Sequence, residues 1–227
     1  IVGEINWQFP FYIYLTALIC LVLVAIFLPK PEHKEQAEVS PSESNSVNKT
    51  TVKLIFITSL LAMMLFFIGF VTLPLYLPQS FDFTESQTGY LLAFISVIAI
   101  LTASQMPRMV KAQGSTKTVA LGFLFFALGY LVLATTSSLA FLILTVIFIG
   151  IGFGFTIPLL NHLMLENSTP QNQGKNLSLF SMGVFGGQFL STFIEFSDAY
   201  VAIYGVATGL AFIFCIGIYF VFQKVFK

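Results

Sequence analysis

Residues 139–155 read LAFLILTVIFIGIGFGF, and this stretch decides the fold class. Apolar side chains stand at both odd and even positions, so the segment lacks the alternation of a membrane β-strand. The apolar run continues to Asn161, which is long enough for a helix to cross the roughly 30 Å hydrocarbon core of a bilayer. Because only helices and closed barrels satisfy their backbone hydrogen bonds in lipid, this stretch predicts a membrane-spanning helix.

Six further stretches have the same character, and none of the seven contains Lys or Arg. The composition agrees, since 57% of the 227 residues are apolar and only 9% are charged, against about 25% charged in soluble domains. The sequence therefore predicts an all-α integral membrane protein with seven transmembrane helices. The predicted spans are Pro10–Leu28, Leu54–Leu77, Gln87–Met106, Thr118–Thr135, Leu139–Asn161, Leu177–Ile194 and Tyr200–Gln223.

A polar segment separates the first span from the other six. Residues 29–50 read PKPEHKEQAEVSPSESNSVNKT. Such a segment buries too little apolar surface to order itself, so we expect a disordered linker over residues 29–53. The chain then divides into residues 1–28 with one helix, the linker, and residues 54–227 with six helices.

All ten Lys and Arg residues fall on one side of this seven-span arrangement. Cytoplasmic loops collect basic residues, so the linker and the C-terminus are predicted to be cytoplasmic, in a plasma or inner membrane, with the N-terminus outside. An odd helix that enters from outside and precedes six others predicts a twelve-helix protein cut near its middle. The opposite side carries acids and no base: Glu4, Asp82, Glu85, Glu195 and Asp198.

Three short motifs occur in a fixed order along this arrangement. WQFPF at residues 7–11 is similar to the entrance of the sixth helix in drug-efflux-like members of the major facilitator superfamily. MPRMVKAQGSTK at residues 106–117 resembles the second copy of that family's short cytoplasmic loop motif, and QGKN at residues 173–176 resembles the entry to its eleventh helix. The chain thus resembles the second half of this family preceded by the last helix of the first half.

Four residues match the loop motif, Arg108, Lys111, Gly114 and Lys117. The family's usual Asp is absent, and Lys111 stands near its place. The basic residues fit two interpretations. They form a latch that pairs with acids or helix C-termini when the inner gate closes, or they serve only as the topological signal.

The resemblance implies a secondary carrier with alternating access that exports a small molecule or drug. It implies no cofactor, and as partners a small-molecule substrate, the lipid bilayer and an N-terminal helical bundle that this chain lacks. The six-helix bundle would consist of two inverted three-helix repeats, residues 54–135 and 139–223.

One predicted span carries a polar stripe. Ser181, Gln188, Thr192 and Glu195 recur at intervals of seven, four and three residues, which places them on one helical face. Polar groups are costly in lipid, so this face is expected to line a substrate cavity, with Gln188 near mid-membrane. The alternative is interhelical hydrogen bonding, worth about 0.6 kcal/mol per contact. Asn161, near the inner end of the fifth span, is a further cavity candidate.

Glycines spaced four residues apart occur in three of the predicted spans. Such pairs let two helices approach closely, and in a carrier they would also permit sliding or bending. Close packing is the interpretation we adopt. The pairs are Gly150 with Gly154, Gly183 with Gly187, and Gly205 with Gly209.

Other functional classes fit less of the sequence. A retinal protein needs a Schiff-base Lys inside its last helix, and Tyr200–Gln223 has none; a receptor would need an unusually long first cytoplasmic loop. A non-transporting truncated remnant or an assembly partner remains an alternative. No P-loop, Ser–His pairing or H-E-x-x-H motif is present, so we expect no enzyme. The two Cys and two His have no ligand spacing for a metal, and zero net charge argues against nucleic acid.

Overall fold

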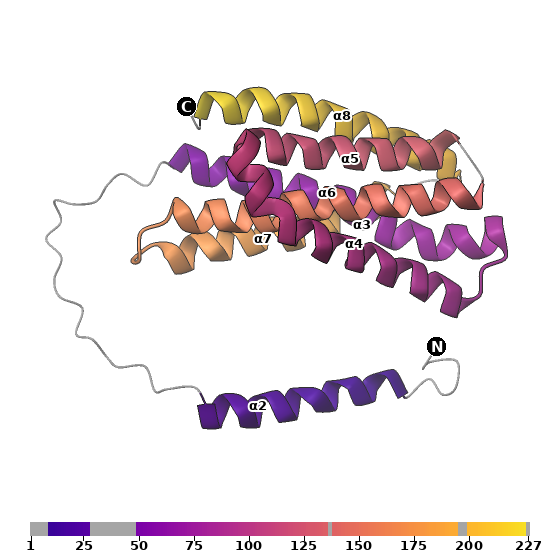
Figure 1. The fold of residues 1–227 in the computed structure, drawn as a ribbon, viewed down its shortest axis with the longest axis horizontal. Helices are drawn as coiled ribbons and strands as arrows, with labels where there is room; N and C mark the ends of the chain where they lie inside the picture. Colours follow the sequence, from indigo (N-terminus) through magenta and orange to yellow (C-terminus); the bar gives the residue numbers. More distant parts are fainter. Residues whose placement is uncertain (1–8, 28–48, 136–137, 195–198, 226–227) are drawn as a thin grey trace, which may run out of the picture. The chain divides into compact units, whose positions relative to one another are not determined.

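The computed structural model describes residues 9–27, 49–135, 138–194 and 199–225 (Figure 1). These residues are helical, with no strand among them, and the chain divides into two compact units, Ile1–Asn45 and Ser46–Lys227. Six of the described helices are long and apolar enough to cross a membrane, and a seventh apolar helix is shorter. The prediction of an all-α membrane protein with about seven helices is confirmed.

In the first unit, a 3₁₀ segment η1 (Phe9–Leu15) leads directly into α2 (Thr16–Phe27). With rises of about 2.0 and 1.5 Å per residue, these two segments together extend roughly 32 Å, enough to cross a bilayer. The side chains described on α2, Cys20 among them, are exposed and almost all apolar. Trp7 and Gln8 of the WQFPF motif lie outside the described residues, as do residues 29–48 of the predicted linker.

The second unit contains six helices, and each includes most or all of one predicted span. The first begins at Lys49, five residues inside the predicted linker, so the boundary expected at Leu54 is too late. The sixth predicted span ends as a short 3₁₀ segment rather than an α-helix. The elements are α3 (Lys49–Phe81), α4 (Glu85–Gln113), α5 (Ser115–Thr135), α6 (Leu139–Glu166), α7 (Gln173–Ser191), η3 (Thr192–Ile194) and α8 (Tyr200–Val225).

Tight connections join α3, α4 and α5 end to end. Asp82 follows α3 with a φ of 51°, a left-handed conformation that Asp tolerates and that ends the helix. α4 then starts with a capping box, in which the Thr84 hydroxyl accepts from the Gln87 N–H and the Gln87 side chain accepts from the Thr84 N–H. Gly114 alone separates α4 from α5.

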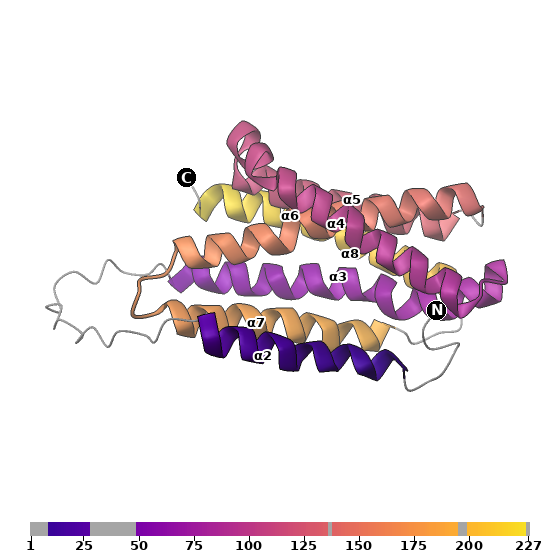
Figure 2. The same ribbon diagram turned by 60° about the horizontal axis from the view of Figure 1, so that its bottom comes forward.

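The six helices pair in a pattern with an approximate two-fold relation (Figures 1 and 2). Extensive contacts join α3 to α7 and α4 to α6, and α5 to α8. If α3 is exchanged with α6, α4 with α7, and α5 with α8, the α3–α7 pair becomes the α4–α6 pair. The α5–α8 pair is unchanged by the same exchange. The extensive α5–α6 contact has only a small counterpart between α3 and α8, so the relation is imperfect. Three helices per repeat make the second repeat run opposite to the first.

Burial is uneven across the bundle. About half of the apolar window of α3, α5 and α6 is buried, 50–56%, whereas the figures for α4 and α7 are 17% and 22%. The largest fully buried side chains include Tyr130, Tyr204, Phe123 and Phe126, all on α5 and α8. Within this unit α4 and α7 are therefore edge helices that pack through one narrow side each.

The alternating directions of the helices gather the charges at the two ends of the bundle. Every described Lys and Arg lies at one end, which we call the basic end; Figure 1 shows the C-terminus and the start of α3 there. Asp82 and Glu85 lie at the opposite end, between α3 and α4. The described basic residues are Lys49, Lys53, Arg108, Lys111, Lys117, Lys175 and Lys224.

Candidate functional site

The polar stripe of α7 is only partly a continuous helical face. Ser181 and Gln188 are half-buried in the regular part of α7, two turns apart on the same side. Thr192 is exposed and starts η3, and its hydroxyl donates to the Phe189 carbonyl at 2.7 Å. Glu195 lies outside the described residues.

Gln188 follows Gly187, at which α7 lies against the backbone of α3. Its own carbonyl accepts a hydrogen bond from the Ser191 hydroxyl at 2.6 Å, but no hydrogen bond joins its side-chain amide to another described residue. An amide that is half-buried in a membrane protein needs a polar partner, because its hydrogen bonds to water are lost. The Gln188 amide is thus available to a polar group from outside this bundle.

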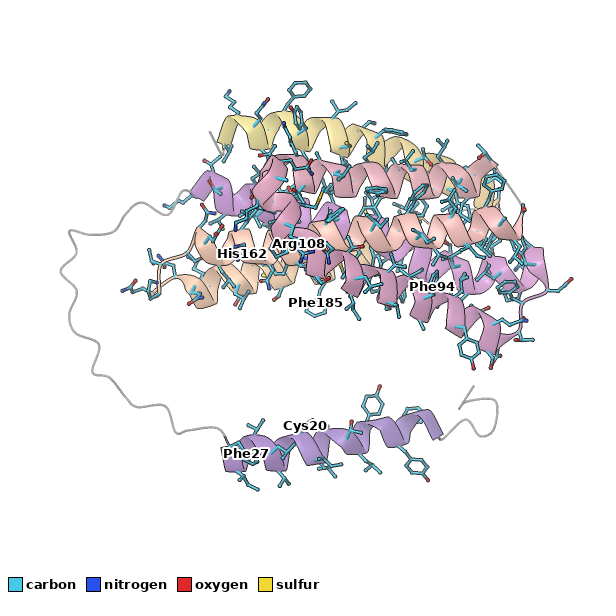
Figure 3. All side chains as sticks on the ribbon, viewed as in Figure 1. Cys20, Phe27, Phe94, Arg108, His162 and Phe185 are labelled. Atoms are coloured by element: carbon cyan, nitrogen blue, oxygen red, sulfur yellow. The ribbon has the colours of Figure 1, made fainter. Side chains whose placement is uncertain are left out.

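Asn161 is half-buried on α6, one turn beyond Pro158. Its Oδ1 atom is buried and accepts no hydrogen bond from the described residues. The neighbouring His162 points outward and its Nε2 lies 3.1 Å from Oε1 of Glu166, one turn along the same helix. Figure 3 shows His162 toward the basic end, the same direction as Arg108. Asn161 therefore faces inward, as do the fully buried Thr145 and Thr156 of α6, whereas His162 faces outward.

Two glycine pairs lie where the parallel helices touch. A Cβ added at Gly150 would meet the Ile95 carbonyl oxygen at 2.9 Å, and one at Gly154 would meet the Ala99 carbonyl oxygen at 2.7 Å, both on α4. At Gly183 it would meet the Phe56 carbonyl oxygen of α3 at 2.8 Å. These distances leave no room for a methyl group, so α6 lies directly on the α4 backbone and α7 on that of α3.

Gly187 continues the α3–α7 contact, since an added Cβ there would overlap the Leu60 carbonyl oxygen of α3. The third pair behaves differently. At Gly205 and Gly209 an added Cβ would meet nothing within 4 Å among the described residues, and both positions are exposed. The close helix approach expected there is wrong for this bundle.

The loop motif forms the α4–α5 connection at the basic end. Gly114 has a φ of 84°, a conformation that L side chains rarely adopt, which accounts for glycine at this position. Arg108 donates to the Gln105 side chain at 2.9 Å on the same helix. Lys111 and Lys117 are exposed, and no ion pair joins Arg108, Lys111 or Lys117 to an acid within the described part of the chain.

One contact in the centre of the bundle has no clear sequence signal. The Tyr130 hydroxyl of α5 accepts from the Gly69 N–H at 2.8 Å and donates to the Leu65 carbonyl oxygen, both on α3. Leu65 and Gly69 are four residues apart, so the hydroxyl stands between the two groups of one helical hydrogen bond. A side chain inserted in this way is a recognised cause of helix bending. Gly69 leaves the space, since a Cβ there would lie 3.2 Å from the Tyr130 oxygen.

Aromatic packing also crosses from α3 to α6. Phe66 contacts Phe70 and Phe153, with ring centroids 4.9 and 4.3 Å apart. Phe70 and Phe153 are half-buried, so the cluster reaches the surface of the bundle. The rings of Phe66 and Phe153 thus join α3 to α6.

Comparison with known families gives one match. The model of the Major Facilitator Superfamily matches residues 1–192, which include η1, α2 and the helices from α3 through α7. A search of curated proteins gave no match.

Proposed function

This chain belongs to the major facilitator superfamily, a family of membrane transporters, and from that premise we propose that it is part of a secondary carrier that exports a small molecule or drug by alternating access. The observation that carries the proposal is the Gln188 amide. It is half-buried on an edge helix of the bundle and has no hydrogen-bond partner among the described residues. Such a group suits a substrate that presents a donor or acceptor.

Four polar side chains would line the substrate path at different depths. With a rise of about 1.5 Å per residue, Asn161 lies roughly 8 Å from the basic end of α6, and Ser181 and Gln188 lie roughly 12 and 22 Å from that end of α7. Thr192 follows near the opposite end. The spread favours a path with successive contacts over one compact pocket.

A second helical bundle is proposed to cover α4 and α7. These are the two least buried long helices of the unit, and they expose large apolar side chains such as Tyr90 and Leu101 on α4 and Met182 and Phe185 on α7. Figure 3 shows Phe185 directed away from the bundle. We assign residues 1–28 to the last helix of that N-terminal bundle, residues 29–48 to the connecting linker, and the chain from the start of α3 at Lys49 onward to the C-terminal bundle.

The basic end is proposed to face the cytoplasm, because Lys and Arg collect in cytoplasmic loops. All described Lys and Arg lie at that end, and the linker and the C-terminus would then be cytoplasmic too. The membrane would be the plasma or inner membrane.

The test compares two substitutions on α7 in the full-length carrier. Gln188→Ala removes the amide, whereas Leu190→Ala removes an apolar side chain that is 38% exposed on the same helix. Export of a panel of fluorescent cationic dyes from loaded cells is measured for both variants at matched expression. We expect the first variant to lose most of its export and the second to keep it. Equal effects would remove Gln188 from the path, and no export by the unchanged protein would favour a non-transporting role.

A further inference from the structure

A groove lies between α5 and α8 at the basic end, on helices that the proposed substrate path does not use. It consists of two adjoining cavities of about 320 and 290 Å³ that share Gln113, Lys117 and Tyr219. We propose that this groove binds a phospholipid with an acidic head group from the leaflet at the basic end. The proposal does not depend on the carrier's substrate or direction of transport.

The larger cavity has the lining that an acyl chain requires. Its floor is Ala120, whose small side chain lets Cys215 of α8 approach; the Cys215 thiol donates to the Ala120 carbonyl oxygen at 3.2 Å. Leu121 and Leu124 of α5 form one wall, and Ile216 and Phe220 of α8 form the other. Ile216 and Phe220 are 58% and 63% exposed, so the groove opens sideways, where a lipid chain would enter.

The smaller cavity has a more polar lining than the larger one and lies nearer the end of the bundle. It is lined by Ser115, Thr116 and Lys117 at the start of α5 and by Tyr219 and Gln223 near the end of α8. Hydroxyl, amide and ammonium donors therefore surround one space, directly beyond the apolar cavity. This increase in polar groups along one groove matches the order of acyl chain and head group in a phospholipid.

The charge of the head group follows from Lys117. Its ammonium group has no carboxylate within ion-pair distance among the described residues. The described parts of α5 and α8 contain no Asp or Glu at all. An exposed, unpaired Lys beside hydrogen-bond donors at the membrane surface attracts anionic lipid, and one such Lys contributes about fivefold in affinity.

The experiment measures lipid retention by the full chain. The protein is purified from detergent that contains phosphatidylglycerol and phosphatidylcholine with identical acyl chains, and bound lipid is counted by native mass spectrometry. We expect phosphatidylglycerol to be retained about fivefold over phosphatidylcholine. Lys117→Gln should remove this preference, while the control Lys111→Gln, an exposed Lys of α4 outside the groove, should keep it.

A second variant tests the apolar part of the site. Leu124→Trp fills the larger cavity and should lower the retention of both lipids without changing the elution of the folded protein in size-exclusion chromatography. If this variant fails to fold, the comparison of Lys117→Gln with Lys111→Gln decides alone. The proposal is overturned if the unchanged protein retains both lipids equally, which would mean that any lipid or another helix fills the groove. It is also overturned if the two Lys variants lose the preference equally, or if inorganic phosphate displaces the bound lipid.

Discussion

Gly187→Ala offers the most direct test of how α7 is held against α3. A Cβ at this position would overlap the Leu60 carbonyl oxygen and would lie 2.9 Å from the Met63 Cβ and from the Met64 nitrogen. Ordinary contacts of a Cβ are 3.4–4 Å. All three obstacles are backbone atoms or a Cβ, so no rotation of a side chain relieves them. α7 must therefore move away from α3 by a distance on the order of 1 Å.

The size of the effect follows from two opposing contributions. Overpacking of a close-packed interior costs about 1–3 kcal/mol, and the obstacles here are rigid. Ala is better than Gly in a helix by about 1 kcal/mol, which offsets part of that cost. The free energy of unfolding should therefore fall by about 1–2 kcal/mol.

The adjacent glycine provides a matched control. A Cβ at Gly186 meets only the Leu60 Cδ1 at 3.6 Å, an ordinary contact. Gly186→Ala should thus be neutral or slightly stabilising, since only the helix preference remains. Unfolding of both variants is followed by circular dichroism during titration with SDS in mixed micelles. If Gly187→Ala were as stable as Gly186→Ala, α7 would not lie on the α3 backbone as described, and the close contact next to Gln188 would be refuted.

Three further predictions concern other parts of the bundle. Gly114→Ala should lower the free energy of unfolding by about 1–2 kcal/mol in the same titration, because it forces a side chain into the φ of 84°. The control Gly174→Ala, where an added Cβ meets open space, should leave it unchanged. Similar losses in both variants would contradict the positive φ at Gly114. Tyr130→Phe should lower the free energy of unfolding by only about 1 kcal/mol, because the Leu65 carbonyl and the Gly69 N–H that it releases can bond to each other. The Gly69 amide should then exchange with deuterium more slowly. Faster exchange would show that this helical hydrogen bond does not form. A single Cys at position 82 should react with an impermeant maleimide from outside the cell and one at position 111 only after permeabilisation; the reverse pattern would exclude the proposed orientation.

The sequence predicted the helices well because length and hydropathy are set by the bilayer itself. Each of the six long helices contains most or all of its predicted span, and the errors lie at the ends. α3 starts at Lys49 rather than Leu54 because polarity marks where lipid stops and not where the helix stops. α4 starts at Glu85 rather than at the predicted Gln87, because Thr84 and Gln87 form a capping box at its N-terminus.

Helix packing was only partly predictable, and the glycines show why. The four-residue spacing is the same in the pair that begins at Gly205 and the pair that begins at Gly183. Only the pair that begins at Gly183 meets another helix in this bundle. Conversely, Gly122 of α5 and Gly152 of α6 lie face to face, with an added Cβ at either 3.0 Å from the other's carbonyl oxygen. A close contact depends on both helices. A glycine pattern within one helix therefore does not guarantee a close contact. Nor does it reveal a contact between two glycines that lie on different helices.

The candidate site is harder to predict for a related reason. In a soluble protein an apolar face marks the core, but here the outward faces of α4 and α7 are as apolar as the buried ones, so hydropathy does not separate inside from outside. The informative residues are the few polar ones. Gln188 stood out because it interrupts an apolar helix, and it is half-buried beside the contact of α7 with α3. Tyr130 did not stand out, because in an apolar sequence a Tyr reads as one more aromatic residue in spite of its hydroxyl. Its role emerged only from the structure, which places that hydroxyl against Leu65 and Gly69 of α3.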